Sequence, residues 1–124
     1  GLLIGISAGV VCYFATQYIK RVLKIDDSLD VFPVHGVGGA LGCLLTAVFY
    51  SNSFGGLQPV DEVYSISSQF GVQAIGVVAT VVWCAVITFF ILKLVDMMTG
   101  LRVAEDEETE GLDIVLHNER GYNI

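Results

Sequence analysis

The stretch DVFPVHGVGGALG, residues 30–42, decides the class of this chain. It opens an uncharged run over residues 31–50, and roughly 20 such residues form a helix long enough to cross a bilayer. His35 then lies at membrane depth, where an ionisable ring is costly unless it faces protein or a water-filled cavity. A histidine in this position therefore indicates a functional site.

Two more uncharged stretches, residues 1–19 and 63–92, lie on either side of this run. Hydrophobic residues make up 54% of the chain and charged residues only 15%, whereas about a quarter of the residues in an ordinary soluble domain are charged. The sequence predicts an all-α integral membrane protein with three transmembrane helices, at about residues 1–19, 31–50 and 69–95.

The basic residues indicate how these helices are oriented. They lie in the first connection and at or beyond the end of the third helix, at Lys20, Arg21, Lys24, Lys93, Arg102 and Arg120. Because loops rich in Lys and Arg stay in the cytoplasm, we expect the first connection and the C-terminus on that side. The transmembrane region then covers residues 1–99, and residues 100–124 form a cytoplasmic tail.

The tail carries much of the net charge of −7, since residues 105–110 hold five acids in six positions. Such a run is unsuited to binding nucleic acid, so we expect no nucleic-acid partner. The apolar side chains that follow, between Leu112 and Leu116, make the tail too hydrophobic for a merely disordered end. Two interpretations of the tail therefore stay open: it docks on something, or its acidic run is simply solvated.

Two acids precede the second predicted helix, and they have two interpretations. Asp27 and Asp30 are both favoured N-cap residues, and Pro33 suits the first turn of a helix, so these residues can simply start the helix. A negatively charged pore mouth would also gather cations. Both interpretations remain open at the level of sequence.

Glycines crowd the second predicted helix. Each glycine costs about 1 kcal/mol in a helix relative to alanine, so four of them predict close helix packing on at least two sides. They are Gly36, Gly38, Gly39 and Gly42, of which Gly38 and Gly42 form a GxxxG motif. A phosphate-binding GxGxxG loop is excluded, because Leu41 stands where the third glycine would be.

Histidine can accept and donate hydrogen bonds and can change charge near neutral pH. His35 can therefore line a pore and relay protons, ligate a haem or metal, or make a structural hydrogen bond. No second ligand at suitable spacing supports a metal site, and His117 lies beyond the last predicted helix. The cysteines, one per predicted helix, are expected to pack as small buried hydrophobic residues: Cys12, Cys43 and Cys84.

The segment DDSLDVFPVHGVGGALGCLLTAVF, residues 26–49, resembles a C-terminal signature of the ammonium transporter family, the Amt/Mep/Rh group. The segment GLRVAEDEETEGLDIVLHNERGYN, residues 100–123, is similar to that family's cytoplasmic C-terminal region. The resemblance covers essentially the whole chain. It implies the last three of eleven helices, so we expect this chain, which starts at Gly1, to be part of a longer protein whose N-terminal helices are missing.

The resemblance also implies roles for single residues. His35 matches the second of two paired histidines in a hydrophobic pore, and the partner histidine belongs to an earlier helix. Val31 matches an apolar pore-lining residue one turn before it. Asp27 and Asp30 match acids at the cytoplasmic pore mouth.

In the tail, the resemblance implies a region that contacts the neighbouring subunit and transmits regulation. Its residues here are Glu110, Gly111, Asp113, His117 and Tyr122. Asn118 departs from the family, where a glycine is common. Asparagine is the next best residue for a left-handed backbone, so we expect the turn to survive.

The function implied is transport of ammonium or ammonia by a homotrimer in the plasma or inner membrane, without enzymatic activity, cofactor or metal. In a prokaryote, the implied partner is a PII-type nitrogen regulator at the cytoplasmic face. Two alternatives remain: an ammonium sensor on the same fold that signals through the tail, and a three-helix respiratory anchor that uses His35 as a haem ligand.

Overall fold

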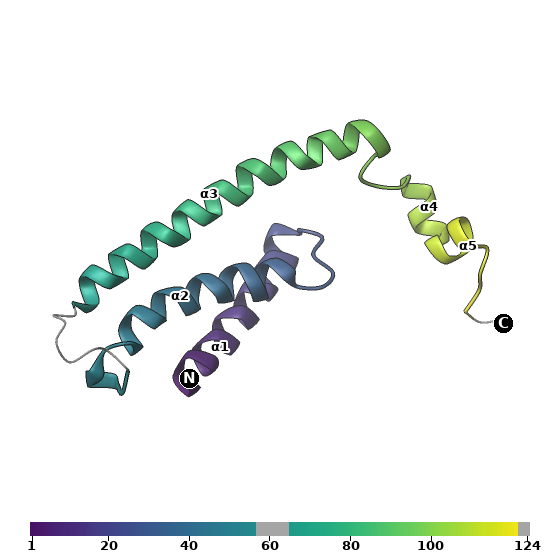
Figure 1. The fold of residues 1–124 in the computed structure, drawn as a ribbon. Helices are drawn as coiled ribbons and strands as arrows, with labels where there is room; N and C mark the ends of the chain where they lie inside the picture. Colours follow the sequence, from purple (N-terminus) through teal and green to yellow (C-terminus); the bar gives the residue numbers. More distant parts are fainter. Residues whose placement is uncertain (57–64, 122–124) are drawn as a thin grey trace. The chain divides into compact units, whose positions relative to one another are not determined.

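The computed structural model describes residues 1–56 and 65–121, and these residues contain helices and no β-strand. Three helical segments are long and apolar enough to cross a membrane: Leu2–Leu23, Phe32–Phe49 and Ile66–Thr99 (Figure 1). The prediction of an all-α chain with three transmembrane helices is confirmed. The chain divides into two compact units, Gly1–Val81 and Val82–Ile124, which are described separately.

The first segment is helix α1, Leu2–Tyr18, continued by one turn of π-helix, η1, Ile19–Leu23. We expected the helix to end at residue 19, before the basic cluster, and it ends later. Lysine and arginine are good helix formers and complement the negative end of the helix dipole, so the cluster extends the helix. It ends at Lys24, which has φ 53°, and the N–H groups of Lys24 and Ile25 both donate to the carbonyl of Ile19.

The second segment begins as a π-helix, η2, Phe32–Val37, and continues as α2, Gly38–Phe49. Pro33 occupies its first turn, as predicted, and is fully buried. Proline has no N–H, and at this position the N–H would have no partner within the helix, so Pro33 fits the helix start without the loss of a hydrogen bond. His35 lies inside this irregular stretch, and π-type turns are frequent at functional sites. A short 3₁₀ turn, η3, Asn52–Phe54, follows α2.

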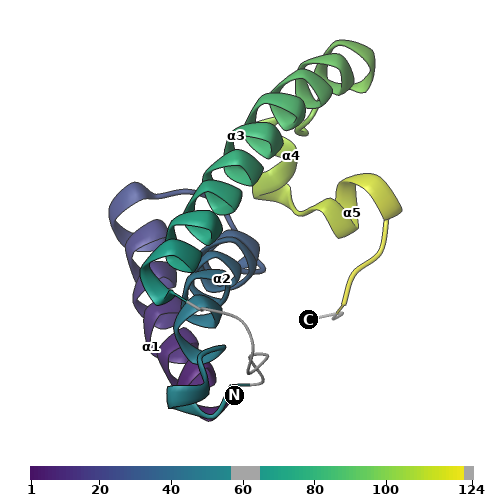
Figure 2. The same ribbon diagram turned by 60° about the vertical axis from the view of Figure 1, so that its left-hand side comes forward.

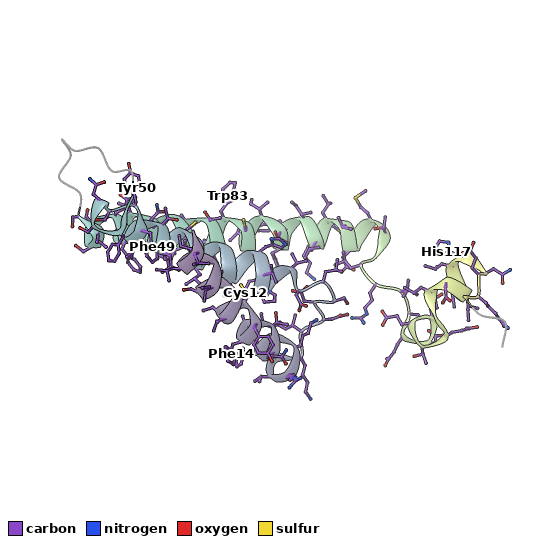
Figure 3. The ribbon with its side chains drawn as sticks, turned by 90° about the horizontal axis from the view of Figure 1, so that it is seen from below. Cys12, Phe14, Phe49, Tyr50, Trp83 and His117 are labelled. Carbon is purple, nitrogen blue, oxygen red and sulfur yellow. The ribbon has the colours of Figure 1, made fainter. Side chains whose placement is uncertain are left out.

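Helices α1 and α2 pack side by side within the first unit, as both views show (Figures 1 and 2). They approach closely at Cys12, whose Sγ lies 3.9 Å from the carbonyl oxygen of Val34. A Cβ placed on Gly38 would lie only 2.9 Å from the same sulfur. Glycine is therefore what lets the two helices meet at this point. Figure 3 labels Cys12 on α1.

Helix α3, Ile66–Thr99, has 34 residues and so is about 51 Å long at 1.5 Å per residue. The hydrocarbon core of a bilayer is about 30 Å thick, so this helix must tilt or protrude. It is longer at both ends than the predicted residues 69–95. None of its residues is buried within the described chain, and the large side chain of Trp83 is 68% exposed (Figure 3).

The tail forms two short helices, α4, Glu105–Glu110, and α5, Leu112–His117, which contact each other. The Arg102 guanidinium donates two hydrogen bonds to the Glu108 carboxylate, one of them 2.8 Å long, and ties the segment before α4 to that helix. This guanidinium lowers the pKa of Glu108. The acidic run is thus folded rather than extended.

Candidate functional site

His35 is exposed within this chain, on the η2 turn of the second transmembrane segment. Val31, the other predicted pore residue, lies roughly one turn earlier and is also exposed. The structure thus brings these two residues together at the start of one helix, where neither is covered by α1.

Asp27 starts the second segment. One of its carboxylate oxygens accepts a hydrogen bond from the Val31 N–H at 2.9 Å, and the other accepts from the Phe32 N–H at 2.8 Å. The hydrogen bonds from Phe32 and Val31, together with the charge of Lys20, lower the pKa of Asp27. The carboxylate therefore satisfies N–H groups that the helix start leaves free. This geometry favours the helix-start interpretation for Asp27.

We expect Asp27→Ala to destabilise the complete protein more at pH 7 than near pH 3. The folded pKa lies below the ordinary value of 3.8, so the stabilising contribution is fully present above that value and is lost as the pH falls through the lower folded pKa. Thermal unfolding in detergent at several pH values measures the effect. The difference in Tm between Asp27→Ala and the wild type should become smaller as the pH falls. Asp96→Ala is the matched control, and a gap that stays constant with pH would contradict the expectation.

Asp30 makes a different contact. One of its carboxylate oxygens lies 2.9 Å from the Nζ of Lys20, and the two side chains remain 32% and 40% exposed, respectively. Asp30 has φ 55°, in the left-handed region, and its carbonyl accepts the N–H of Val34 at 3.0 Å. Asp30 therefore begins the second segment with its backbone while its side chain reaches back to the first.

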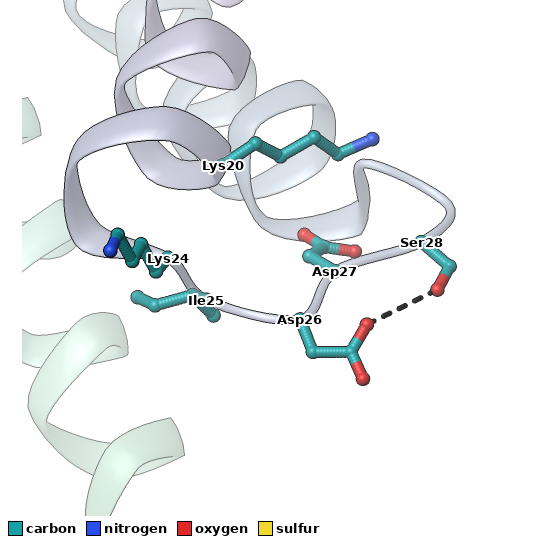
Figure 4. A pocket seen from close by; sticks show the side chains of 6 residues that line it. All are labelled: Lys20, Lys24, Ile25, Asp26, Asp27 and Ser28. Carbon is teal, nitrogen blue, oxygen red and sulfur yellow. Dashed lines mark hydrogen bonds between the residues drawn. The ribbon is translucent and has the colours of Figure 1, made fainter. Parts of the chain in front are cut away.

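The loop between the two segments encloses a shallow pocket. Its lining residues are Lys20, Lys24, Ile25, Asp26, Asp27 and Ser28 (Figure 4). The Ser28 hydroxyl donates to Asp26 at 3.3 Å, and Lys20 extends across the loop from η1 (Figure 4). The mixture of charges in this pocket shows that the acids of the loop are partly neutralised by lysine. Within residues 1–56 and 65–121, no group of three or more potential metal ligands is close enough to hold an ion.

The predicted packing glycines differ in what surrounds them. Gly38 meets Cys12 of α1, and a Cβ on Gly36 would lie 3.1 Å from the ring of Phe32 in the same segment. Gly39 and Gly42 face open space, because, apart from the adjacent backbone of their own helix, nothing of the described chain lies within 4 Å of the position that a Cβ would take on either residue. Contact with a second helix is therefore seen at Gly38, and for Gly39 and Gly42 it stays a prediction.

The cysteines differ from expectation. Cys12 packs between the helices, but Cys43 and Cys84 are exposed. Spacing along the sequence places one thiol on each helix, yet it does not say which side of the helix another helix covers. No described segment of this chain covers Cys43 or Cys84.

In the tail, Gly111 joins α4 to α5 with φ 108°, and its carbonyl accepts the N–H groups of Ile114 and Val115. A Cβ at this position would lie 2.7 Å from the Oδ1 of Asp113. Of the other predicted tail residues, Glu110 ends α4 and His117 ends α5, while Tyr122 lies outside the described residues.

The turn after α5 is as predicted. Asn118 has φ 52°, its N–H donates to the carbonyls of Asp113 and Ile114, and the N–H of Glu119 donates to Asp113 at 3.0 Å. Asparagine thus holds the left-handed position where glycine is common, and the expectation that the turn survives is confirmed.

Gly111→Ala is expected to destabilise the tail helices by about 1–3 kcal/mol, because a side chain at this φ is strained and meets Asp113. Hydrogen exchange of the Ile114 and Val115 amides in the complete protein should accelerate. Gly121→Ala is the control, since nothing lies within 4 Å of its Cβ position. Equal protection in both variants would show that the backbone at Gly111 does not hold the tail.

Sequence reasoning missed three pairings: Lys20 with Asp30, Cys12 with Gly38, and Arg102 with Glu108. The first could have been found from opposite charges at the facing ends of two antiparallel helices joined by a short loop. The second depends on where the helices cross, and nothing in the local sequence marks it.

These features define the class: an α-helical membrane protein whose second transmembrane segment begins with an irregular, histidine-bearing turn. The sequence profile of the Ammonium Transporter Family matches residues 1–122. The chain belongs to this family.

Relatives from distant organisms are named ammonium transporters. An ammonium transporter of Aquifex aeolicus (strain VF5) is 41% identical over 99% of this chain and 28% of its own length. The ammonium transporter of Bacillus subtilis (strain 168) is 35% identical over 98% of this chain and 30% of its own, and ammonium transporter 1 of Dictyostelium discoideum is 36% identical over 97% and 26%. The chain thus spans less than a third of the length of these relatives. No solved structure matches it.

Proposed function

We propose that the complete protein containing these residues transports ammonium or ammonia across a membrane. The observation that carries this proposal is the family match over residues 1–122, together with relatives that are named ammonium transporters. The three apolar helices fit a transport protein, and the acidic tail extends beyond them.

In this proposal, His35 and Val31 line the pore on the second segment. Ammonium and K⁺ carry the same charge, and moving either through hydrocarbon is expensive. Only ammonium can shed its proton and continue as a small neutral molecule, a form that desolvation favours. The imidazole of His35 accepts a hydrogen bond or a proton from the substrate, while apolar Val31 keeps the passage poor in water. Selectivity against K⁺ is then chemical as well as steric.

The arrangement of the complete protein is part of the same proposal. In this proposal the protein lies in the plasma or inner membrane, and the basic residues of the first connection support a cytoplasmic side for that connection and for the tail. Three subunits each carry one pore, and upstream helices supply the second pore histidine. Asp27 and Asp30 stand at the cytoplasmic mouth, and the tail, with Glu110 to His117, transmits regulation from a neighbouring subunit or a PII-type protein.

Reconstitution of the complete protein in proteoliposomes tests the proposal. We expect an imposed ammonium gradient to drive substrate flux while an equal K⁺ gradient drives none. If ammonium binds without flux and alters partner binding to the tail, the sensor alternative is correct. A Soret band in the visible spectrum of the purified protein would instead support the haem-anchor alternative.

A further inference from the structure

We propose that Lys20 and Asp30 are positioning residues for His35, because their ion pair connects the start of the second transmembrane segment to the end of the first. This inference rests on the proposed pore role of His35. It assigns a role to a lysine that sequence patterning places only in a charge cluster.

The two acids at the start of the second segment have separate roles. Asp27 binds the free N–H groups of Val31 and Phe32, so the helix is capped without help from Asp30. The side chain of Asp30 instead lies 2.9 Å from the ammonium of Lys20, on η1. Its contact is therefore between the two segments, whereas that of Asp27 is local to one.

The backbone around this ion pair is held in an uncommon conformation. Lys24 and Asp30, at either end of the loop, have φ 53° and 55°, a region that residues other than glycine rarely adopt. Such conformations persist where surrounding contacts over-determine them, and they concentrate at functional sites. The Lys20–Asp30 contact is one such constraint, and it acts directly on the residue where the second segment begins.

His35 lies between two points of attachment to the first segment. The ion pair is five residues before it, and the contact between Gly38 and Cys12 is three residues after it. With both points in place, the turn that carries the imidazole cannot tilt against α1. Without the ion pair, the second segment keeps its contacts with Cys12 at Val34 and Gly38 but loses its attachment at Asp30, so the turn can shift and the ring moves with it. A displacement of about 1 Å is enough to impair a group that must meet its substrate in a set geometry.

Two variants remove the ion pair without removing the local backbone preference. Lys20→Met deletes the cation, and Asp30→Asn deletes the carboxylate charge while keeping a residue type that tolerates left-handed φ. In the complete protein in proteoliposomes, we expect each to raise the K⁺-to-ammonium flux ratio by about threefold to tenfold. The double variant should do no more than the stronger single one, since both remove one contact. Lys20→Arg should retain the wild-type ratio.

Lys24→Met is the matched control, because Lys24 shares the loop, the charge and the left-handed backbone, whereas the ammonium that contacts Asp30 is that of Lys20. We expect it to leave the flux ratio unchanged. An unchanged ratio in Lys20→Met and Asp30→Asn, or additive effects in the double variant, would overturn the inference. A lower Tm with an unchanged ratio would show a structural role alone.

A second measurement separates this inference from the proposed function. The ring ¹⁵N resonances of His35, assigned by their loss in His35→Ala, should shift in Lys20→Met and Asp30→Asn and not in Lys24→Met. If the wild-type protein carries no ammonium, the proposed function fails, yet these shifts would still support the positioning role. Resonances that stay in place in all three variants would overturn it whether or not the protein transports ammonium.

Discussion

His35→Ala in the complete protein is expected to abolish most of the discrimination between ammonium and K⁺, with a rise in the K⁺-to-ammonium flux ratio of at least about tenfold. The imidazole is the only group on the η2 turn that can both accept a proton and donate a hydrogen bond. In the proposed pore, ammonium then loses its proton acceptor on this helix and the passage beside residue 35 widens, so the chemical and the steric parts of selectivity weaken together.

Paired flux measurements in proteoliposomes, with ammonium or K⁺ as the driven ion, test this expectation. His35→Gln is the informative comparison. The glutamine amide fills similar space and forms hydrogen bonds, but it cannot take up a proton near neutral pH. If His35→Gln preserves K⁺ exclusion but slows ammonium flux, the space-filling role of the ring is separable from its role as a proton acceptor. Unchanged ammonium flux and unchanged K⁺ exclusion in His35→Ala would rule out a pore role for this residue.

Gly38→Leu is expected to destabilise the packing of α1 against α2. A Cβ at this position already lies 2.9 Å from the Cys12 sulfur, so a longer side chain must displace that thiol or push α1 and α2 apart. Over-packing of this kind typically costs about 1–3 kcal/mol of the free energy of unfolding. Because His35 lies three residues away, the flux ratio should change as well.

Thermal unfolding in detergent measures the loss, and a second substitution identifies its cause. Cys12→Ala removes the sulfur that Gly38 faces and should restore part of the stability of Gly38→Leu. Cys43→Ala removes an exposed thiol of the same second segment and should restore none. Equal behaviour of the two double variants would mean that the contact with Cys12 does not limit the space at Gly38.

Several elements could be predicted from the sequence because their cause is local. An uncharged run of about 20 residues must form a helix in a bilayer, since every backbone polar group has to be paired inside the segment. The left-handed turn at Asn118 was also predictable, because the residue type at one position limits which backbone conformations are accessible there. The family itself could be identified from residues 26–49 and 100–123, and the match over residues 1–122 confirms it.

Helix ends were predicted less well. The first helix continues through Lys20 and Arg21 to Leu23. The third extends three residues earlier and four later than expected, to Ile66 and Thr99. Hydrophobicity marks where the hydrocarbon begins and ends, but a helix can continue into water through charged residues that favour it. Polarity therefore determines which part of a helix is embedded in the membrane. The residue at which the helix ends depends on capping and on the geometry of the loop that follows.

The pattern of apolar and charged residues was sufficient by itself to determine the class of this protein, the number of its transmembrane helices and the position of the histidine within the second. Burial in lipid depends on composition over short stretches of chain, which is why this pattern is enough. Only the tertiary structure decided that Asp27 caps the helix while Asp30 binds Lys20, and that Gly38 meets Cys12. These pairings depend on how the chain reverses between two helices, which brings together residues that no local pattern connects.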